Sequence, residues 1–325
     1  MTRIAGIIDI GSNSTNLLIL RFEDNDQPQT LLRTLAVTKL GSGVLHTATL
    51  QPNHVEVTLE QLRLYRHELD AHSATHIYAV TTAAVRSTAN ADDFLDAAQK
   101  ILGVRPLVIT GEQEGRLSFL GAQTDLTFAS HVRKIGVVDI GGGSTEMVVG
   151  DLGSAVAPRV ISVPLGARNL TEGELHSDPP RPEELTNAIG AIVDEFDDVL
   201  RLMPEVADCD EIIGIAGTIV TVAMVELGLA EFHHDTLHGM TLTKDAAEDV
   251  FRTLATESLK DRIFNPGLSP DRADVIVGGC CVVVGMMRKL QQSHIIVSTA
   301  SLLDGVAAIT RNDERPLVDI LSDYE

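Results

Sequence analysis

The feature that most constrains the fold is a short motif that occurs twice in the chain. An apolar run ends in Asp-Ile-Gly followed by small polar residues at positions 7–14, and a similar run occupies positions 137–144. The two copies start about one domain length apart. A repeat at this distance indicates two related halves rather than a solenoid, whose period is about 20 to 50 residues.

Each copy is followed by a second apolar segment that favours a strand, at residues 16–22 in the first half and 146–150 in the second. Each half therefore opens with a strand, a Gly-rich turn and another strand. Further strand-like runs, such as 77–80 and 212–215, alternate with amphipathic helical patterns. This alternation predicts an α/β protein. The expected divisions are 1–128 for the N-terminal domain, 129–312 for the C-terminal domain and 313–325 for a charged tail.

The charge balance excludes one large class of partners. The chain has 25 Lys and Arg against 46 Asp and Glu, which gives a formal net charge of −21. A surface this acidic does not attract a nucleic-acid backbone or an anionic membrane. The three cysteines form no C-x-x-C pair, which favours a reducing compartment, and the longest apolar run is too short to cross a bilayer. We expect a cytoplasmic protein with no nucleic-acid or membrane partner.

The repeated turns have the composition of phosphate-binding loops. Small residues let backbone N–H groups approach an anion closely, without a positive side chain. One such turn is more often an ordinary hairpin turn, but two in register, each preceded by an Asp, favour phosphate. A third turn, which follows the strand at 212–215, is explained equally well by close strand-to-helix packing. The candidate phosphate-binding residues are Gly11, Ser12, Asn13, Ser14, Gly141, Gly142, Gly143, Ser144, Thr145, Gly217 and Thr218.

Three acidic residues lie beside the first two turns: Asp9, Asp139 and Glu146. Carboxylates next to phosphate usually indicate a hard cation, because Mg²⁺ bridges one or two carboxylates to phosphate oxygens. The alternative is that Asp9 and Asp139 only stabilise their turns by hydrogen bonds. We predict that at least one of the three contacts a metal ion.

Two further residues have the chemistry of a hydrolytic site. Residues 110–113 have the form of a capping box, so a helix is expected to begin there with Glu114 in its first turn. The helix dipole would keep this carboxylate ionised, as a base that activates water requires. Arg86 follows the strand at 77–80, where a guanidinium is well placed to bind phosphate. The alternatives are a carboxylate that only complements the helix dipole and a solvated arginine.

Taken together, these motifs resemble the exopolyphosphatase and guanosine-pentaphosphate phosphatase (Ppx/GppA) family. That family lies in the superfamily that includes actin, sugar kinases and heat-shock chaperone ATPases. The resemblance extends in order over about residues 4 to 310. The segments that carry it are residues 9–14, 81–86, 91–94, 111–117, 138–146, 164–167, 214–218, 237–239 and 270–276.

The resemblance implies two ribonuclease-H-like domains, as in the actin-like ATPase superfamily, that flank a cleft. It also implies metal-dependent release of terminal phosphate from polyphosphate or a nucleotide tetra- or pentaphosphate. By position, Glu114 matches the family's proposed catalytic base and Arg86 its phosphate-binding arginine. Asp139 and Glu146 match its metal-side acids, and residues 141–145 match its phosphate loop.

The chain departs from the family pattern at two places. The family commonly has Gly-Ala/Cys-Val-Arg-Leu where this chain has Arg168 and Asn169 before Leu170, so the arginine is moved by one residue. The common Leu-Arg-Glu-Gly appears here as residues 302–305, with Leu303 and Asp304 in the middle. The chain also stops where longer relatives carry further helical domains, which predicts a preference for shorter polyphosphate.

Several functional alternatives stay open from the sequence. The first is an exopolyphosphatase with Mg²⁺ or Mn²⁺ as cofactor, and the second is a guanosine pentaphosphate (pppGpp) phosphohydrolase. A non-catalytic sensor of polyphosphate or alarmone and a kinase-like transferase are the alternatives of other classes. The sequence also leaves the oligomeric state open, with a homodimer as one option.

Overall fold

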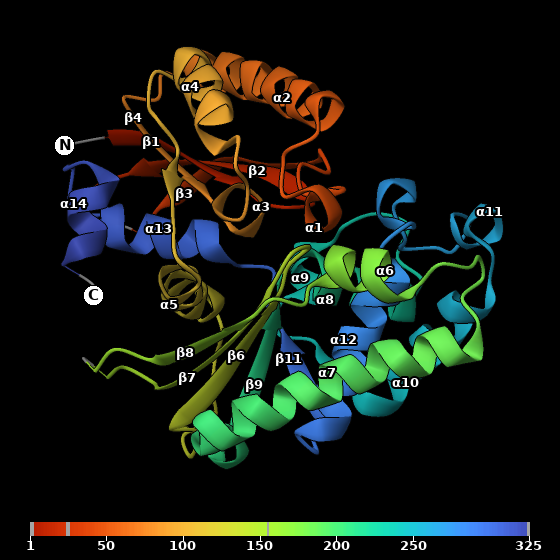
Figure 1. The fold of residues 1–325 in the computed structure, drawn as a ribbon. Helices are drawn as coiled ribbons and strands as arrows, with labels where there is room; N and C mark the ends of the chain where they lie inside the picture. Colours follow the sequence, from red (N-terminus) through yellow and green to blue (C-terminus); the bar gives the residue numbers. More distant parts are fainter. Residues whose placement is uncertain (1–2, 24–26, 155, 324–325) are drawn as a thin grey trace.

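The computed structural model describes residues 3–23, 27–154 and 156–323, and these form two lobes, each built on a mixed β-sheet (Figure 1). The first sheet has the strand order β3-β2-β1-β4-β5. Strands β1, β2 and β3 form an antiparallel meander, whereas β4 and β5 run parallel to β1. The bounds are Arg3–Ile10 for β1, Ser14–Phe22 for β2, Gln29–Val37 for β3, His76–Thr81 for β4 and Leu107–Val108 for β5.

The second sheet repeats this arrangement, with the strand order β10-β11-β9-β6-β7-β8. Strands β6 to β8 form an antiparallel meander like β1 to β3, and β9 pairs in parallel with β6 as β4 does with β1. The duplication predicted from the sequence motif is therefore confirmed in the pairing. The bounds are Lys134–Ile140 for β6, Thr145–Asp151 for β7, Arg159–Val163 for β8, Glu211–Ile215 for β9, Thr241–Thr243 for β10 and His294–Val297 for β11.

Helices cover both faces of the first sheet. On one face, α2 (Pro52–Ala71) and α4 (Ala91–Leu102) form a hydrophobic core with the strands. On the opposite face lie α13 (Leu302–Thr310) and α14 (Leu317–Ser322), which come from the end of the chain (Figure 1). Helix α14 falls within the expected charged tail, and its Leu317, Ile320 and Leu321 are buried in this core. The short helices here are α1 (Val44–Thr47) and α3 (Ala83–Arg86).

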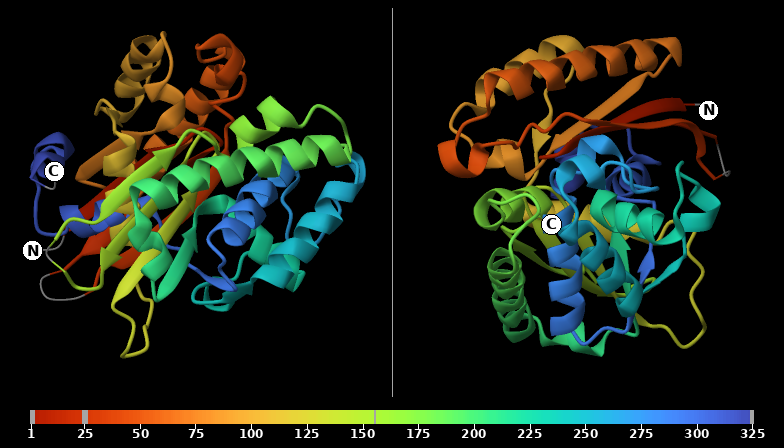
Figure 2. Two further views of the ribbon diagram at one scale, coloured as in Figure 1. Left: turned by 60° about the horizontal axis from the view of Figure 1, so that its bottom comes forward. Right: turned by 90° about the vertical axis from the view of Figure 1, so that its right-hand side faces the viewer.

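The second sheet is covered on one face by long helices that share one large core with it. Figure 2 shows the longest of them, α7, running across the sheet in its left-hand view. Helix α12 is buried along nearly its whole length, yet among the described residues no helix combines the length and apolarity needed to cross a membrane. The bounds in this lobe are Ala167–Glu174 for α6, Pro182–Leu202 for α7, Pro204–Asp208 for η1, Ala216–Leu227 for α8, His234–Leu237 for α9, Lys244–Thr256 for α10, Leu259–Arg262 for α11, Pro270–Arg272 for η2 and Ile276–Lys289 for α12.

Two helices are exchanged between the lobes. Helix α5 (Gly111–Ala122) comes from the first half of the chain but packs on β7 and β8, whereas α13 comes from the second half and packs on β1 and β2. The two helices cross in close contact, because a Cβ on Gly121 would lie 1.9 Å from the Ser301 carbonyl oxygen. A Cβ on Gly305 would lie equally close to the carbonyl oxygen of Leu117. The expected boundary at residue 128 lies between α5 and β6 and stays a prediction.

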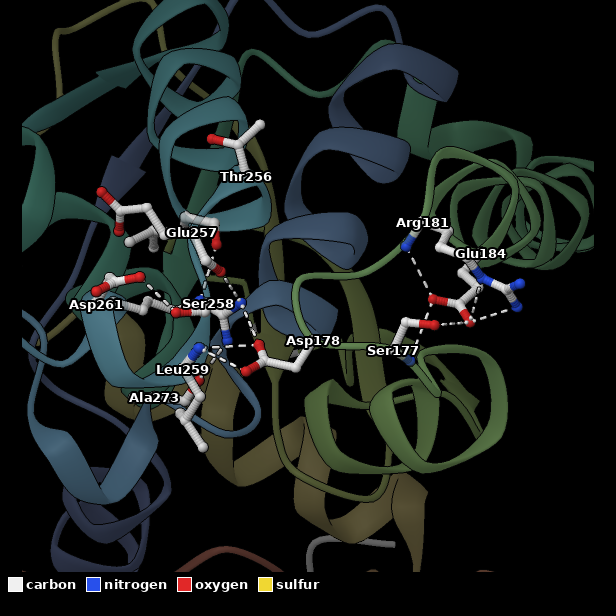
Figure 3. A network of polar contacts seen from close by, with 12 residues as sticks. Ser177, Asp178, Arg181, Glu184, Thr256, Glu257, Ser258, Leu259, Asp261 and Ala273 are labelled. Atoms are coloured by element: carbon white, nitrogen blue, oxygen red, sulfur yellow. Dashed lines mark hydrogen bonds and ion pairs between the residues drawn. The ribbon is translucent and has the colours of Figure 1, made fainter.

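A polar network fixes the far end of the second lobe (Figure 3). The carboxylate of Asp178 accepts bonds of 2.9 Å from the backbone N–H of Leu259. The buried guanidinium of Arg262 donates to the Ala273 carbonyl at 3.0 Å and to the Glu257 carbonyl at 2.7 Å. This network holds the turn at 270–275, whose Asp274 bonds Lys39 in the first half of the chain at 2.7 Å.

Candidate active site

The two repeated turns have the same closing geometry. Gly11 N–H donates to the Ser14 carbonyl at 2.9 Å, and Gly141 N–H donates to the Ser144 carbonyl at 3.0 Å. Within the described residues, the backbone N–H groups at positions 12, 13, 142 and 143 donate to no protein acceptor. Unpaired amides gathered in a tight turn are the elements of an anion-binding nest.

The lobes bring the two turns into direct contact. A Cβ on Gly142 would lie 3.0 Å from the Asn13 Cβ, and one on Gly143 would lie 2.7 Å from the Ser12 Oγ. Larger residues at these positions would push the turns apart. The candidate phosphate residues of the first two turns, positions 11–14 and 141–145, therefore form one continuous site. The Thr145 hydroxyl is fully buried and donates to the Leu165 carbonyl at 2.7 Å, so this side chain supports the turn.

The three metal-side acids each have one oxygen held by a neutral donor. Asn16 Nδ2 donates to Asp9 Oδ2 at 2.9 Å. Ser118 Oγ donates to Asp139 Oδ2 at 2.6 Å, and Ser162 Oγ donates to Glu146 Oε1 at 2.7 Å. The remaining oxygens Asp9 Oδ1 and Glu146 Oε2 are buried and have no partner among the described residues.

Burial makes these acids hold their protons unusually strongly. Burial, opposed by the hydrogen bond from Asn16 and aided by the neighbouring Asp139, raises the pKa of Asp9 from 3.8 to about 7. Burial and Asp139 also raise the pKa of Glu146 from 4.5 to about 8. The pKa of Asp139 is raised by burial. Charged carboxylates in a low-dielectric site repel one another, so positive charge nearby would stabilise the ionised form of this cluster.

Glu114 faces this cluster from the first turn of α5. The predicted capping box is present, with Thr110 and Gln113 bonded to each other's backbone N–H groups. Glu114 is 8% exposed, and its Oε2 lies 3.3 Å from Arg86 Nη1. The Arg86 Nη1 also donates to the Ile109 carbonyl at 2.6 Å. The structure thus brings together the predicted base and the predicted phosphate-binding arginine.

The prediction that the helix dipole keeps Glu114 ionised is wrong for the protein without a bound cation. Burial, followed by repulsion from Glu146 and Asp139, raises the pKa of Glu114 well above its ordinary value, although Arg86 lowers it. A helix terminus contributes only about 0.3 to 1 kcal/mol to a charge, which is less than the desolvation of a buried carboxylate. Ionisation of Glu114 at neutral pH therefore needs further positive charge nearby.

The donor set fits a hard divalent cation that is only partly ligated by protein. In the part of the chain that the structure describes, no three acidic, His or Cys side chains are arranged to hold a metal by themselves. Mg²⁺ commonly uses one or two carboxylates and takes its other ligands from water and phosphate. The free oxygens of Asp9 and Glu146 match that requirement.

The third predicted turn lies at the start of α8, beside an arginine that sequence reasoning did not single out. A Cβ on Gly217 would lie 2.2 Å from Nη1 of Arg272, so the guanidinium lies directly against this glycine. Burial lowers the pKa of Arg272, and no carboxylate of the described residues forms an ion pair with it. Thr218 is buried in the next position of the helix. Arg272 therefore adds an uncompensated positive charge to the predicted phosphate turn.

Two serines at the site were also missed by the sequence analysis. Ser118 lies four residues after Glu114, and this spacing places both on one face of α5, so a signal was present. Ser162 stands opposite Glu146 in the pairing of β7 with β8. That partnership depends on strand register, which the sequence of β8 alone does not reveal.

Comparison with known proteins identifies the family. Residues 18–310 match the Ppx/GppA phosphatase family. The chain belongs to this family. Its members are phosphoanhydride hydrolases, and this chain is one of them.

The relatives agree over nearly the whole chain. A protein named Exopolyphosphatase 2 from Mycobacterium tuberculosis is 33% identical over 324 residues, which cover 94% of this chain and 98% of the relative. A solved exopolyphosphatase-like protein has a TM-score of 0.88 at 29% identity and covers 94% of this chain and 96% of its own. The Ppx/GppA family member from Aquifex aeolicus has a TM-score of 0.76 at 29% identity, with 100% of both chains covered. The predicted fold class and family are therefore confirmed.

The second departure from the family pattern has a local structural explanation. Asp304 accepts from the backbone N–H of Ser301 at 2.7 Å and closes a capping box at the start of α13. It also forms an ion pair with Arg33 of β3. Asp304 therefore ties α13 to the first lobe and does not contact the phosphate turns.

Proposed function

We propose that this protein is a metal-dependent exopolyphosphatase that removes the terminal phosphate of inorganic polyphosphate. The observation that carries the proposal is the meeting of two amide nests with the carboxylate of Asp9 and three buried carboxylates, one of which lies beside an arginine. The name and the coverage of the mycobacterial relative support polyphosphate as the substrate class.

The chain's own groups are suited to hydrolysis by positioning. The amides of the two turns hold the phosphates, and Arg86 neutralises charge on the terminal group. Glu114 orients a water molecule and takes its proton as the water oxygen bonds to the terminal phosphorus. The bond from that phosphorus to the bridging oxygen breaks, and the shortened chain keeps the electron pair.

A divalent cation, Mg²⁺ or Mn²⁺, would be held by Asp9, Asp139 and Glu146 together with phosphate oxygens. It would supply positive charge that both the substrate and the buried acids lack. The same charge lowers the pKa of the nearby carboxylates and so keeps Glu114 ionised.

The test compares phosphate release from polyphosphate, guanosine pentaphosphate and ATP in parallel. We expect polyphosphate to be the best substrate. A clear preference for guanosine pentaphosphate would instead identify the protein as a guanosine pentaphosphate phosphohydrolase. ATP-independent release excludes a kinase-like transferase, and binding without turnover would indicate a sensor. Chains of a few phosphates should be used better than chains of several hundred, and equal use of the long chain would contradict this preference.

A matched pair of variants on one helix tests the assigned base. Glu114→Gln should lower kcat by about 10² to 10⁴-fold, because it removes the proton acceptor. Glu112→Gln is the control, since Glu112 is exposed on the same helix and, among the residues that the structure describes, forms an ion pair only with Arg116, at 2.6 Å. Full activity of Glu114→Gln would overturn the assignment. A cytoplasmic location and a homodimer stay predictions.

A further inference from the structure

The arginine displaced from its usual family position lies between the two phosphate turns. Arg168 is in the first turn of α6 and is only 3% exposed. Its backbone N–H donates to the Gly142 carbonyl in the second turn at 2.8 Å. Its side chain reaches the first turn, where Nη2 donates to Asn13 Oδ1. One residue therefore contacts both turns.

This contact determines which way the Asn13 amide faces. A guanidinium carries only donors, so the amide atom next to it must be the oxygen. The backbone carbonyl of Asn13 is also occupied, because it accepts from the N–H groups of Thr38 and Lys39. Asn13 is left with its backbone N–H and its NH₂ group, and no hydrogen bond joins either to another described residue. Both are donors, as a phosphate oxygen requires.

The surroundings of Arg168 hold its charge in place. Its Nη1 lies 3.5 Å from Glu172 and its Nη2 lies 3.9 Å from Asp274, which also binds Lys39 at 2.7 Å. The carboxylate of Glu172 accepts from the Gly43 N–H at 3.2 Å, across the lobes. Two cations and two carboxylates balance here. Removal of the guanidinium would leave one uncompensated negative charge beside the phosphate turns.

We propose that Arg168 is a positioning residue for phosphate binding. It turns the Asn13 amide so that its NH₂ group donates to substrate, and it holds the first turn against the second. Asn169 supports the same arrangement, because its Nδ2 donates to the Gly143 carbonyl at 2.7 Å. This inference rests on the proposed function, since it assumes phosphate in the turns.

The experiment measures the Kd for tripolyphosphate, together with KM and kcat on short polyphosphate. Arg168→Met should raise Kd and KM about 10- to 100-fold, the equivalent of one charge-assisted hydrogen bond. The effect on kcat should be smaller. Arg168→Lys retains one donor for Asn13 Oδ1, so its KM should lie between those of Arg168→Met and the unaltered protein.

Two further comparisons separate positioning from a general loss of structure. Arg3→Met is the matched control, because Arg3 is also buried but bonds the Arg311 carbonyl at 2.9 Å, away from the turns. It should lower Tm without raising KM. In an Asn13→Ala background, Arg168→Met should raise KM less than it does in the unaltered protein, because the amide that Arg168 positions is already absent and only the effect of the lost charge remains.

Several outcomes would overturn the inference. One is an unchanged KM in Arg168→Met, and another is a KM in Arg168→Lys as high as that in Arg168→Met. A third is that Arg168→Met raises KM in the Asn13→Ala background by as large a factor as in the unaltered protein. If Arg168→Met does not fold, the Arg168→Lys and Asn13→Ala variants decide by the same criteria. Failure of the proposed function is distinct, because the unaltered protein would then bind tripolyphosphate without releasing phosphate. The Kd series would still test Arg168 in that case, and absence of binding would overturn both.

Discussion

The two hairpins that open the two halves share a backbone but differ in chemistry. In the first, Asp9 pairs across the strands with Asn16, and in the second, Asp139 pairs with Glu146 at the equivalent position. The first hairpin thus has one acid and one amide, whereas the second has two acids. The duplication provides a pair of matching turns, and the second copy adds most of the carboxylates of the proposed cation site.

The neighbours of the hairpins strengthen this difference. The second hairpin receives Glu114 and Ser118 from α5 and Ser162 from β8. The first hairpin is held by structural contacts, such as the Tyr65 hydroxyl that donates to the Thr15 carbonyl at 2.8 Å. The reaction is therefore expected to depend more on the second hairpin than on the first.

Substitutions of the equivalent residues Glu146 and Asn16 should show the largest difference between the two hairpins. Glu146→Gln should lower kcat/KM by about 10²-fold, because it removes a carboxylate from the cation site. Asn16→Ala should cost less than about tenfold, since it removes only one hydrogen bond to Asp9. Steady-state phosphate release at saturating Mg²⁺ measures both, and equal losses would show that the hairpins contribute alike.

The serines that hold the acids of the second hairpin should give a smaller effect. Ser118→Ala and Ser162→Ala each remove a hydroxyl that orients a carboxylate oxygen. Loss of such a partner typically weakens metal binding about 10- to 100-fold. A Mg²⁺ titration of activity should show a raised half-saturation concentration with little change in the maximal rate. An unchanged titration curve would mean that these acids need no orientation.

With divalent metal removed by a chelator, the pH dependence of stability should differ between the acids of the two hairpins. A carboxyl group whose folded pKa is raised contributes stability below its unfolded pKa, and this contribution is lost as pH rises through the folded pKa. The loss should end near pH 7 for Asp9 and near pH 8 for Glu146. The Tm of Asp9→Asn and of Glu146→Gln should therefore exceed that of the unaltered protein by an amount that grows from pH 5 and levels off near pH 7 and pH 8, respectively. Thermal melts across pH would refute the assignment if the advantage grew toward acid.

The smallest effect is expected at β3, the edge strand that pairs with the first hairpin. Arg33→Ala removes the ion pair with Asp304, and a partly exposed pair contributes less than about 1 kcal/mol. Urea unfolding should show this small loss, while kcat and KM stay near those of the unaltered protein. A large loss of activity would mean that this contact between β3 and α13 controls the site.

The sequence contained most of the fold and the acids of the site. The repeated Asp-Ile-Gly motif predicted both hairpins and their turns, because its small residues specify local structure. The exchange of α5 and α13 between lobes was not predictable, since it depends on the long-range contact of Gly121 with Gly305. The contact of Arg168 with Asn13 was hidden for the same reason, because it joins residues from different lobes.

The central claim is that a cation lets this strongly acidic protein hold a polyanion at its paired turns. The most direct test is the Kd of the Glu114→Gln variant for tripolyphosphate, measured by calorimetry with Mg²⁺ and again with excess chelator. The account predicts that chelation raises Kd by about 100-fold or more, because the uncompensated carboxylates then repel the phosphates. A Kd that is the same in both conditions would contradict it.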